Sequence, residues 1–336
     1  MKVSTSLFFF WSLSAASPLI SKRAGEIAQS NAPWNLRAIS HRSPQSFSFI
    51  NIFRDFKYYY DDEAGKDTVA YVIDGGIRVT HEEFEGRAEN FYTNFQTPTG
   101  EDFFDDKMGH GTHVAGVIAS KTYGVAKKAR VLNVKVLHDK ATSNARILAG
   151  FHASVKHAIQ NNLRNRAVIN LSIGGPPSLP SMNAAIDRSF KMSEGGIVTV
   201  VSAGNNHESA AKQEPAASRE AITVGSIDKS WKISSFSNWG PEVDIFAPGG
   251  DVASLSSDSD TGTVVLSGTS MAAPHVAGLV LNGMSVLGKT SQDIRSFLDD
   301  TSTKGMITGD LLGSPNKLVN NNNVQQNSCK PDDKKC

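Results

Sequence analysis

Three short motifs carry the residue types of a serine hydrolase, and they occur in a fixed order along the chain. Asp74 lies in Val-Ile-Asp-Gly-Gly, His110 is flanked by two glycines, and Ser270 lies in Gly-Thr-Ser-Met-Ala-Ala-Pro. A serine hydroxyl becomes a strong nucleophile when an imidazole accepts its proton, and a carboxylate holds that imidazole in the required tautomer. Asp, then His, then Ser is one of the known chain orders for such a triad. The motifs therefore predict hydrolysis with Asp74, His110 and Ser270 as the catalytic residues.

The sequence around each motif predicts that the polar residue stands at the end of a strand or helix. Residues 68–73 are apolar and rich in β-branched side chains, as in a buried strand that ends at the aspartate. Apolar helices are expected over 114–119, after the histidine, and over 272–281, after the serine. Pro274 would fall in the first turn of the second helix, where its missing N–H costs no hydrogen bond.

Each motif taken alone also has a structural interpretation. An aspartate after a strand is usually a turn residue. His110 and His113 could form half of a metal site, but no Glu or Cys stands nearby to complete it. His275, on an apolar helix, is expected to be a core histidine. The joint occurrence of three extended motifs in order favours catalysis.

Strand-like runs alternate with helical runs over the whole chain of 336 residues. This alternation is typical of a parallel sheet that helices cover on both faces. The runs that read as strands are 68–74, 130–136, 168–172, 197–202 and 222–224.

Further segments resemble the proteinase K-like group of secreted fungal subtilisin-like serine proteases, from about residue 24 to residue 318. The resemblance is carried by 31–40, 58–61, 81–87, 123–127, 236–240 and 244–249, together with Ala203-Gly204-Asn205. It implies an α/β, three-layer fold with a central, mostly parallel sheet. It also implies a monomeric endopeptidase of protein and peptide substrates, with no cofactor for catalysis.

The resemblance also implies roles for individual residues. Asn205 would donate to the oxyanion of the transition state, together with the backbone N–H of Ser270. Substrate would add as a strand to enzyme segments. The implied peptide-binding residues are Ser172, Ile173, Gly174 and Gly175, together with Ala203 and Gly204. A structural calcium ion would be held by the Asp244 side chain and by the carbonyl groups of Arg219 and Ala221.

The two ends of the chain differ from the body. Residues 1–23 combine a basic start, a short apolar stretch and small residues, as in a signal peptide, so we expect a secreted protein. Residues 24–318 would form the catalytic domain, apparently without the pro-domain of family precursors. The unusual insertion 44–57 would be unspliced intron sequence or a surface loop. Residues 319–336 are polar and predict a disordered tail, in which Cys329 and Cys336 would pair or remain free thiols.

Composition and departures from the family pattern leave two hypotheses. The net charge of +1 favours neither nucleic acid nor a membrane as a partner. The first hypothesis is a secreted endopeptidase of broad specificity, with apolar or aromatic residues preferred before the cut. The alternative is an inactive or poorly folding pseudo-protease that at most binds peptide. It is favoured by the missing pro-domain, by the insertion, and by Gly75, which stands where the family usually has Ser or Thr. An α/β-hydrolase esterase is excluded, since no Gly-x-Ser-x-Gly surrounds the serine.

Overall fold

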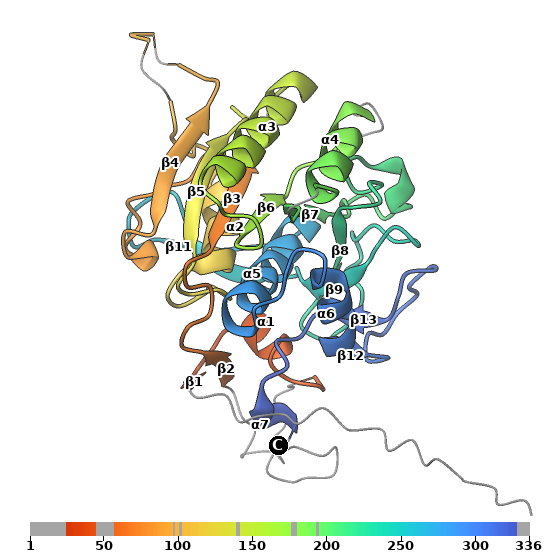
Figure 1. Ribbon diagram of the computed structural model, residues 1–336. Coiled ribbons are helices and arrows are strands. Elements are labelled where there is room, and N and C mark those ends of the chain that lie inside the picture. Colours follow the sequence, from red (N-terminus) through yellow and green to blue (C-terminus); the bar gives the residue numbers. More distant parts are fainter. Residues whose placement is uncertain are drawn as a thin grey trace, which may run out of the picture.

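A nine-stranded sheet forms the centre of the computed structural model (Figure 1), which describes residues 25–44, 57–96, 98–100, 103–138, 142–175, 180–192 and 195–327. The strand order is β12-β13-β9-β8-β7-β6-β3-β5-β4, and every neighbouring pair is parallel except β12 with β13. The strands are β3 (Val69–Asp74), β4 (Ala88–Thr93), β5 (Arg130–Lys135), β6 (Ala167–Leu171), β7 (Val198–Ser202), β8 (Ile222–Ile227), β9 (Ile245–Pro248), β12 (Thr303–Lys304) and β13 (Lys317–Leu318). Two antiparallel pairs lie apart from it: β1 (Glu26–Gln29) with β2 (Tyr58–Asp61), and β10 (Val252–Leu255) with β11 (Thr263–Leu266).

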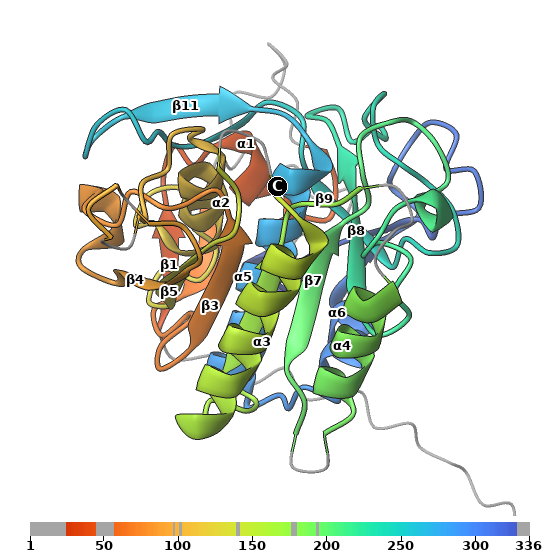
Figure 2. The ribbon, with the colours of Figure 1, turned by 90° about the horizontal axis from the view of Figure 1, so that it is seen from above.

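Helices cover both faces of this sheet, as Figure 2 shows. Side chains alternate along the inner strands: in β3, Ala70 and Val72 belong to one core cluster, whereas Tyr71 and Ile73 belong to the other. The first cluster includes α2 (His110–Ala119), α5 (Thr269–Leu287) and α6 (Ile294–Thr301), and the second includes α3 (Asn144–Gln160) and α4 (Pro180–Phe190). Short helices complete the structure: α1 (Trp34–Ala38), α7 (Val324–Asn327) and the 3-10 turns Glu82–Phe84 and Ala210–Lys212. The prediction of a three-layer α/β fold is confirmed.

Helix α5 is the core helix of the molecule and begins earlier than predicted. It starts at Thr269, so Pro274 is its sixth residue, inside the helix and beyond the first turn. A proline at this place removes the N–H that would bond to the carbonyl of the residue four positions earlier, which is Ser270. Its length and apolar composition would suit a membrane span, but α5 packs against α2 and against strands β6, β7, β8 and β9. It is therefore a buried helix of the core.

The prediction of a disordered tail from residue 319 is wrong for residues 319–327. Val319 and Asn320 are buried, and Asn323 donates through Nδ2 to the carbonyl of Ser40 at 2.9 Å. Asn320 donates in the same way to the carbonyl of His41 at 2.9 Å. Buried asparagine amides bonded to a distant backbone hold this segment against the body, which its polar composition alone does not reveal. The proposed signal peptide 1–23, residues 45–56 of the insertion, and both cysteines lie outside the described residues.

Candidate active site

The candidate catalytic residues lie at the ends of elements that meet at one edge of the sheet. Asp74 is the last residue of β3, His110 the first of α2, and Ser270 the second of α5. Ser172 directly follows β6, and Asn205 follows β7 by three residues. Parallel strands present their carboxyl ends at the same edge, where α/β proteins usually bind ligands. The structure therefore brings together residues that lie up to 196 positions apart in the sequence.

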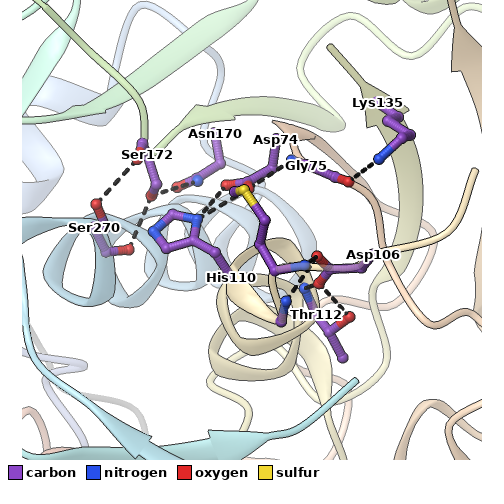
Figure 3. A network of polar contacts seen from close by, with 11 residues as sticks. Asp74, Gly75, Asp106, His110, Thr112, Lys135, Asn170, Ser172 and Ser270 are labelled. Carbon is purple, nitrogen blue, oxygen red and sulfur yellow. Dashed lines mark hydrogen bonds and ion pairs between the residues drawn. The ribbon is translucent and has the colours of Figure 1, made fainter. Parts of the chain in front are cut away.

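Asp74 and His110 form a close pair (Figure 3). The Nδ1 atom of His110 lies 2.9 Å from both carboxylate oxygens, and the backbone N–H of Gly75 donates to Oδ1 at 2.6 Å. The Asp74 side chain is buried, whereas that of His110 keeps 25% of its surface exposed. Burial lowers the pKa of His110, but the charge and hydrogen bond of Asp74 more than offset this, so the pKa lies above its usual value. The pairing directs Nε2 away from the aspartate, as a general base requires.

Ser270 lies beside the His110 ring on the side away from Asp74 (Figure 3), but its hydroxyl is turned to another partner. Its Oγ donates to the carbonyl of Ser172 at 3.0 Å, and Ser172 Oγ donates in return to the carbonyl of Ser270 at 2.9 Å. Within the described part of the chain, no hydrogen bond joins Ser270 to His110. Pro274 explains one half of this arrangement, because it leaves the Ser270 carbonyl without its helical donor. The Ser172 hydroxyl supplies that donor.

Asn205 is oriented by the residue that precedes Ser270. Its Oδ1 accepts from the backbone N–H of Thr269 at 2.8 Å and from the Thr269 hydroxyl at 2.9 Å. Asn205 is exposed, and its Nδ2 group makes no hydrogen bond to any described residue. The side chain is thus fixed at its acceptor end and presents its two donors to solvent beside the start of α5.

The expected peptide-binding residues surround this edge. Ser172 is buried, Ile173 and Gly175 are partly exposed, and Gly174 is exposed. Gly175 pairs with Glu214 through two backbone hydrogen bonds of 2.9 and 3.0 Å, which fixes one side of the segment. Ala203 is buried, and the N–H of Gly204 donates to the Thr269 hydroxyl at 3.1 Å. The Ala203–Gly204 segment is therefore tied to Thr269, the residue that precedes Ser270.

Comparison with known proteins agrees with this geometry. The model of the subtilase family, Peptidase S8, matches residues 65–325. The chain belongs to the subtilase family.

Fungal proteases are among the relatives of this subtilase. It is 41% identical to an alkaline proteinase of Hapsidospora chrysogena, over 87% of this chain and 68% of that protein. It is 41% identical to alkaline protease 1 of Aspergillus oryzae, over 89% and 70%, and 39% identical to proteinase R of Parengyodontium album, over 88% and 71%. A crystal structure of a cold adapted subtilisin-like serine proteinase superposes with a TM-score of 0.75 at 33% identity, covering 87% of this chain and 99% of that one. The resemblance to the fungal group is confirmed, and the protein is a member of a serine protease family.

Two buried residues that sequence reasoning missed support the Asp74–His110 pair of this subtilase. Asp106 accepts from the N–H groups of Met108, Gly109 and Thr112 and from the Thr112 hydroxyl, at 2.7–3.2 Å. It thereby fixes the turn that leads into His110. Its place three residues before Gly109, the residue that precedes the helix, was the available signal for a side chain that accepts from backbone N–H groups.

Lys135 ends β5 and is buried beside the loop that follows Asp74. Its ammonium group donates to the carbonyl of Gly75 and, at 2.8 Å, to the carbonyl of Asp105, and it lies over the ring of Phe103. Figure 3 shows it on the far side of Gly75 from His110. A lysine that follows the largely apolar run Val131–Val134 was the sequence signal for a buried cation.

The expected calcium site is not available to a cation as the subtilase is folded. Asp244 and the carbonyls of Arg219 and Ala221 do converge, as the resemblance implied. They converge, however, on the guanidinium group of Arg295, which contacts all three. The residues present therefore do not fit a calcium ion here, because a positively charged side chain already uses these oxygen atoms.

The other two histidines of the motifs have structural roles in the subtilase. His113 Nε2 donates to the carbonyl of Val252 at 3.0 Å, and burial lowers the pKa of His113 to about 4. His275 is fully buried, with Nδ1 donating to the Met271 carbonyl and Nε2 accepting from Asn35, both at 2.8 Å. Burial lowers the pKa of His275 to about 3. The interpretation of His275 as a core histidine is confirmed.

The raised pKa of His110 yields a prediction about pH. A general base must be unprotonated, so kcat/KM should fall as the pH drops through the pKa of His110. Asp74→Asn removes the charge that raises this pKa, so the acid limb should move to lower pH while the rate falls by about 10⁴-fold. The measurement is the pH profile of kcat/KM on a chromogenic peptide.

Asp105→Asn is the matched control for this experiment, since Asp105 is an exposed aspartate on the adjacent loop. It should leave the acid limb in place. An unchanged acid limb in Asp74→Asn would show that Asp74 does not set the pKa of the base.

Proposed function

We propose that this subtilase is a secreted serine endopeptidase that hydrolyses peptide bonds in proteins through Asp74, His110 and Ser270. The single observation that carries the proposal is the buried Asp74 carboxylate bonded to His110 Nδ1, beside a serine at the start of a helix. Imidazole held in this way accepts a proton at its other nitrogen. A signal-like sequence at residues 1–23 supports secretion, and we propose a monomer.

The proposed reaction begins with a rotation of the Ser270 side chain. Its hydroxyl leaves the Ser172 carbonyl and turns to Nε2 of His110, which accepts the proton as Oγ attacks the substrate carbonyl carbon. Nδ2 of Asn205 and the N–H of Ser270 bind the developing oxyanion; the second N–H of a helix has no intrahelical acceptor. His110 then gives this proton to the departing amine. In the second half of the reaction, water attacks the acyl carbonyl while His110 accepts a proton from the water. His110 returns that proton to Ser270 Oγ as the acyl group leaves.

The substrate is proposed to lie as an extended strand along Ser172–Gly175, bonding through its main chain. The run 197–205, which would form one wall of the first pocket, has no charged residue. An uncharged wall suits apolar or aromatic side chains before the cut. Because a hydrophobic pocket separates close analogues by only about 1–3 kcal/mol, the specificity would be broad.

A pseudo-protease remains the second candidate, on the observation that Gly75 offers Asp74 only its backbone N–H. A Cβ at this position would lie 3.1 Å from the end of the Met108 side chain, so Met108 fills the space that a hydroxyl side chain would need. The first experiment below separates the two candidates.

Ser270 is expected to be the covalent nucleophile. Wild-type protein should react with a fluorophosphonate probe, and Ser270→Ala should neither react nor retain more than about one part in 10⁶ of kcat, a magnitude taken from subtilisin, a member of the same family. Mass spectrometry of the labelled protein locates the site.

Ser267→Ala is the control in the same loop, since Ser267 bonds to Asp251 and not to the triad. It should label as the wild type does. Failure of folded wild-type protein to react with the probe would favour the pseudo-protease.

The amide donor of Asn205 is expected to act only in the transition state. Asn205→Asp keeps the acceptor for Thr269 but removes the donor, so kcat should fall by about 10²–10³-fold, a range measured in subtilisin, with KM nearly unchanged. Steady-state kinetics on a peptide anilide measures both constants. Asn206→Asp adds the same charge at the next exposed residue and should change kcat little. An equal loss of kcat in both variants would mean that the added negative charge, and not the loss of the amide donor, lowers kcat.

The uncharged wall at 197–205 predicts the cleavage pattern. A peptide library digested by the wild-type enzyme should show cuts after several large apolar and aromatic residues, with preferences of about 10–200-fold per methylene at most. The products are identified by mass spectrometry. Cleavage restricted to bonds after Lys or Arg would contradict the proposed pocket.

A further inference from the structure

Arg295 joins three oxygen atoms from residues that precede two neighbouring strands of the sheet. Its Nη1 lies 2.6 Å from Asp244 Oδ1, and its Nη2 donates to the carbonyl of Arg219 at 2.8 Å and to that of Ala221. Arg219 and Ala221 precede β8, Asp244 immediately precedes β9, and Arg295 is the second residue of α6. The guanidinium thus links the start of a helix to the starts of two paired strands.

The Asp244 carboxylate is held in place independently of Arg295. The N–H of Thr223 donates to Asp244 Oδ2 at 2.8 Å, and the N–H of Asp244 donates to the Thr223 carbonyl at 2.9 Å. This leaves Oδ1 directed at the position that the guanidinium fills. One carboxylate oxygen and two carbonyls, fixed by the backbone, form the kind of oxygen cluster that binds calcium.

A calcium ion and this arginine exclude one another. Calcium needs six to eight oxygen ligands at about 2.3–2.6 Å, and the guanidinium donors already lie at the three that these residues would supply. Two positive charges at one carboxylate would also repel each other. The carboxylate of Asp299, which lines the same cavity as Asp244 and Arg295, is already paired with Lys317 at 2.5 Å.

We infer that Arg295 replaces a calcium ion as the cation that fastens α6 to the amino ends of β8 and β9, so that stability at this site does not depend on calcium. A guanidinium keeps its charge over the whole physiological pH range, and its planar set of donors matches several oxygens at once. It is also part of the chain, so dilution or a chelator does not remove it. The positive charge at this site is therefore permanent, whereas a bound metal ion would exchange with the solvent.

The test measures the thermal unfolding midpoint of fluorophosphonate-inhibited protein in excess calcium and in excess EDTA. The wild type and Asp244→Asn should differ by the same amount in both media, because Asp244 serves Arg295 and not calcium. Arg295→Gln should lower the midpoint in EDTA by about 2–4 °C, as expected for the loss of a few charge-assisted hydrogen bonds in a protein of this size. Calcium should then restore part of this loss, and Asp244→Asn in the Arg295→Gln background should remove the restoration.

Arg130→Gln is the matched control, since Arg130 forms an exposed ion pair with Glu89 and contacts none of these oxygens. It should change the midpoint by less than Arg295→Gln, because exposed ion pairs contribute little. A calcium-dependent rise in the wild-type midpoint that Asp244→Asn abolishes would overturn the inference. An unchanged midpoint in Arg295→Gln would overturn it as well. A calcium response that persists in Asp244→Asn arises elsewhere and does not alter the comparison between the variants.

Discussion

The buried carboxylate of Asp74 is the constraint on which the rest of the active site depends. A charge removed from water must be compensated by hydrogen bonds and by an opposite charge. Within the described residues, the Asp74 side chain accepts only from the Gly75 N–H and from His110. His110 is therefore held both by the need of the carboxylate for a partner and by its own place at the start of α2. The same contact raises the pKa of the imidazole.

The backbone around this pair is packed so closely that position 111 has no room for a side chain. A Cβ on Gly111 would lie 2.1 Å from the carbonyl oxygen of Gly76 and 3.0 Å from Asp74 Cβ. Only glycine allows α2 to approach the end of β3 at this distance. Lys135 and Asp106 then fix the two loops from outside, one through carbonyl groups and the other through N–H groups. The cation of Lys135 thus holds the loop after Asp74, and the carboxylate of Asp106 holds the turn around His110.

At two places in the molecule, a side chain supplies a hydrogen-bond donor or a positive charge where another group would be expected. Pro274 removes a helical hydrogen bond from the Ser270 carbonyl, and the hydroxyl of Ser172 replaces it, which ties the segment after β6 to Ser270. At the other edge, a guanidinium occupies an oxygen cluster of the kind that metals fill. In both places a backbone acceptor left free by the fold is bonded by a side chain from a distant element.

The sequence by itself determined the parallel sheet, the order of its inner strands along the chain and the identity of Asp74, His110 and Ser270 as candidates. These features depend on local patterns: β-branched runs, glycines beside a histidine, and small residues before a helix. It did not reveal that Arg295 lies on oxygens 51 to 76 residues away, or that Asn323 bonds to Ser40 across 283 residues. The orientation of the Ser270 side chain was equally hidden, since it depends on the carbonyl of Ser172, directly after β6. Only the tertiary structure decided these contacts, because each pairs a polar group with a backbone acceptor whose availability arises when distant elements pack together.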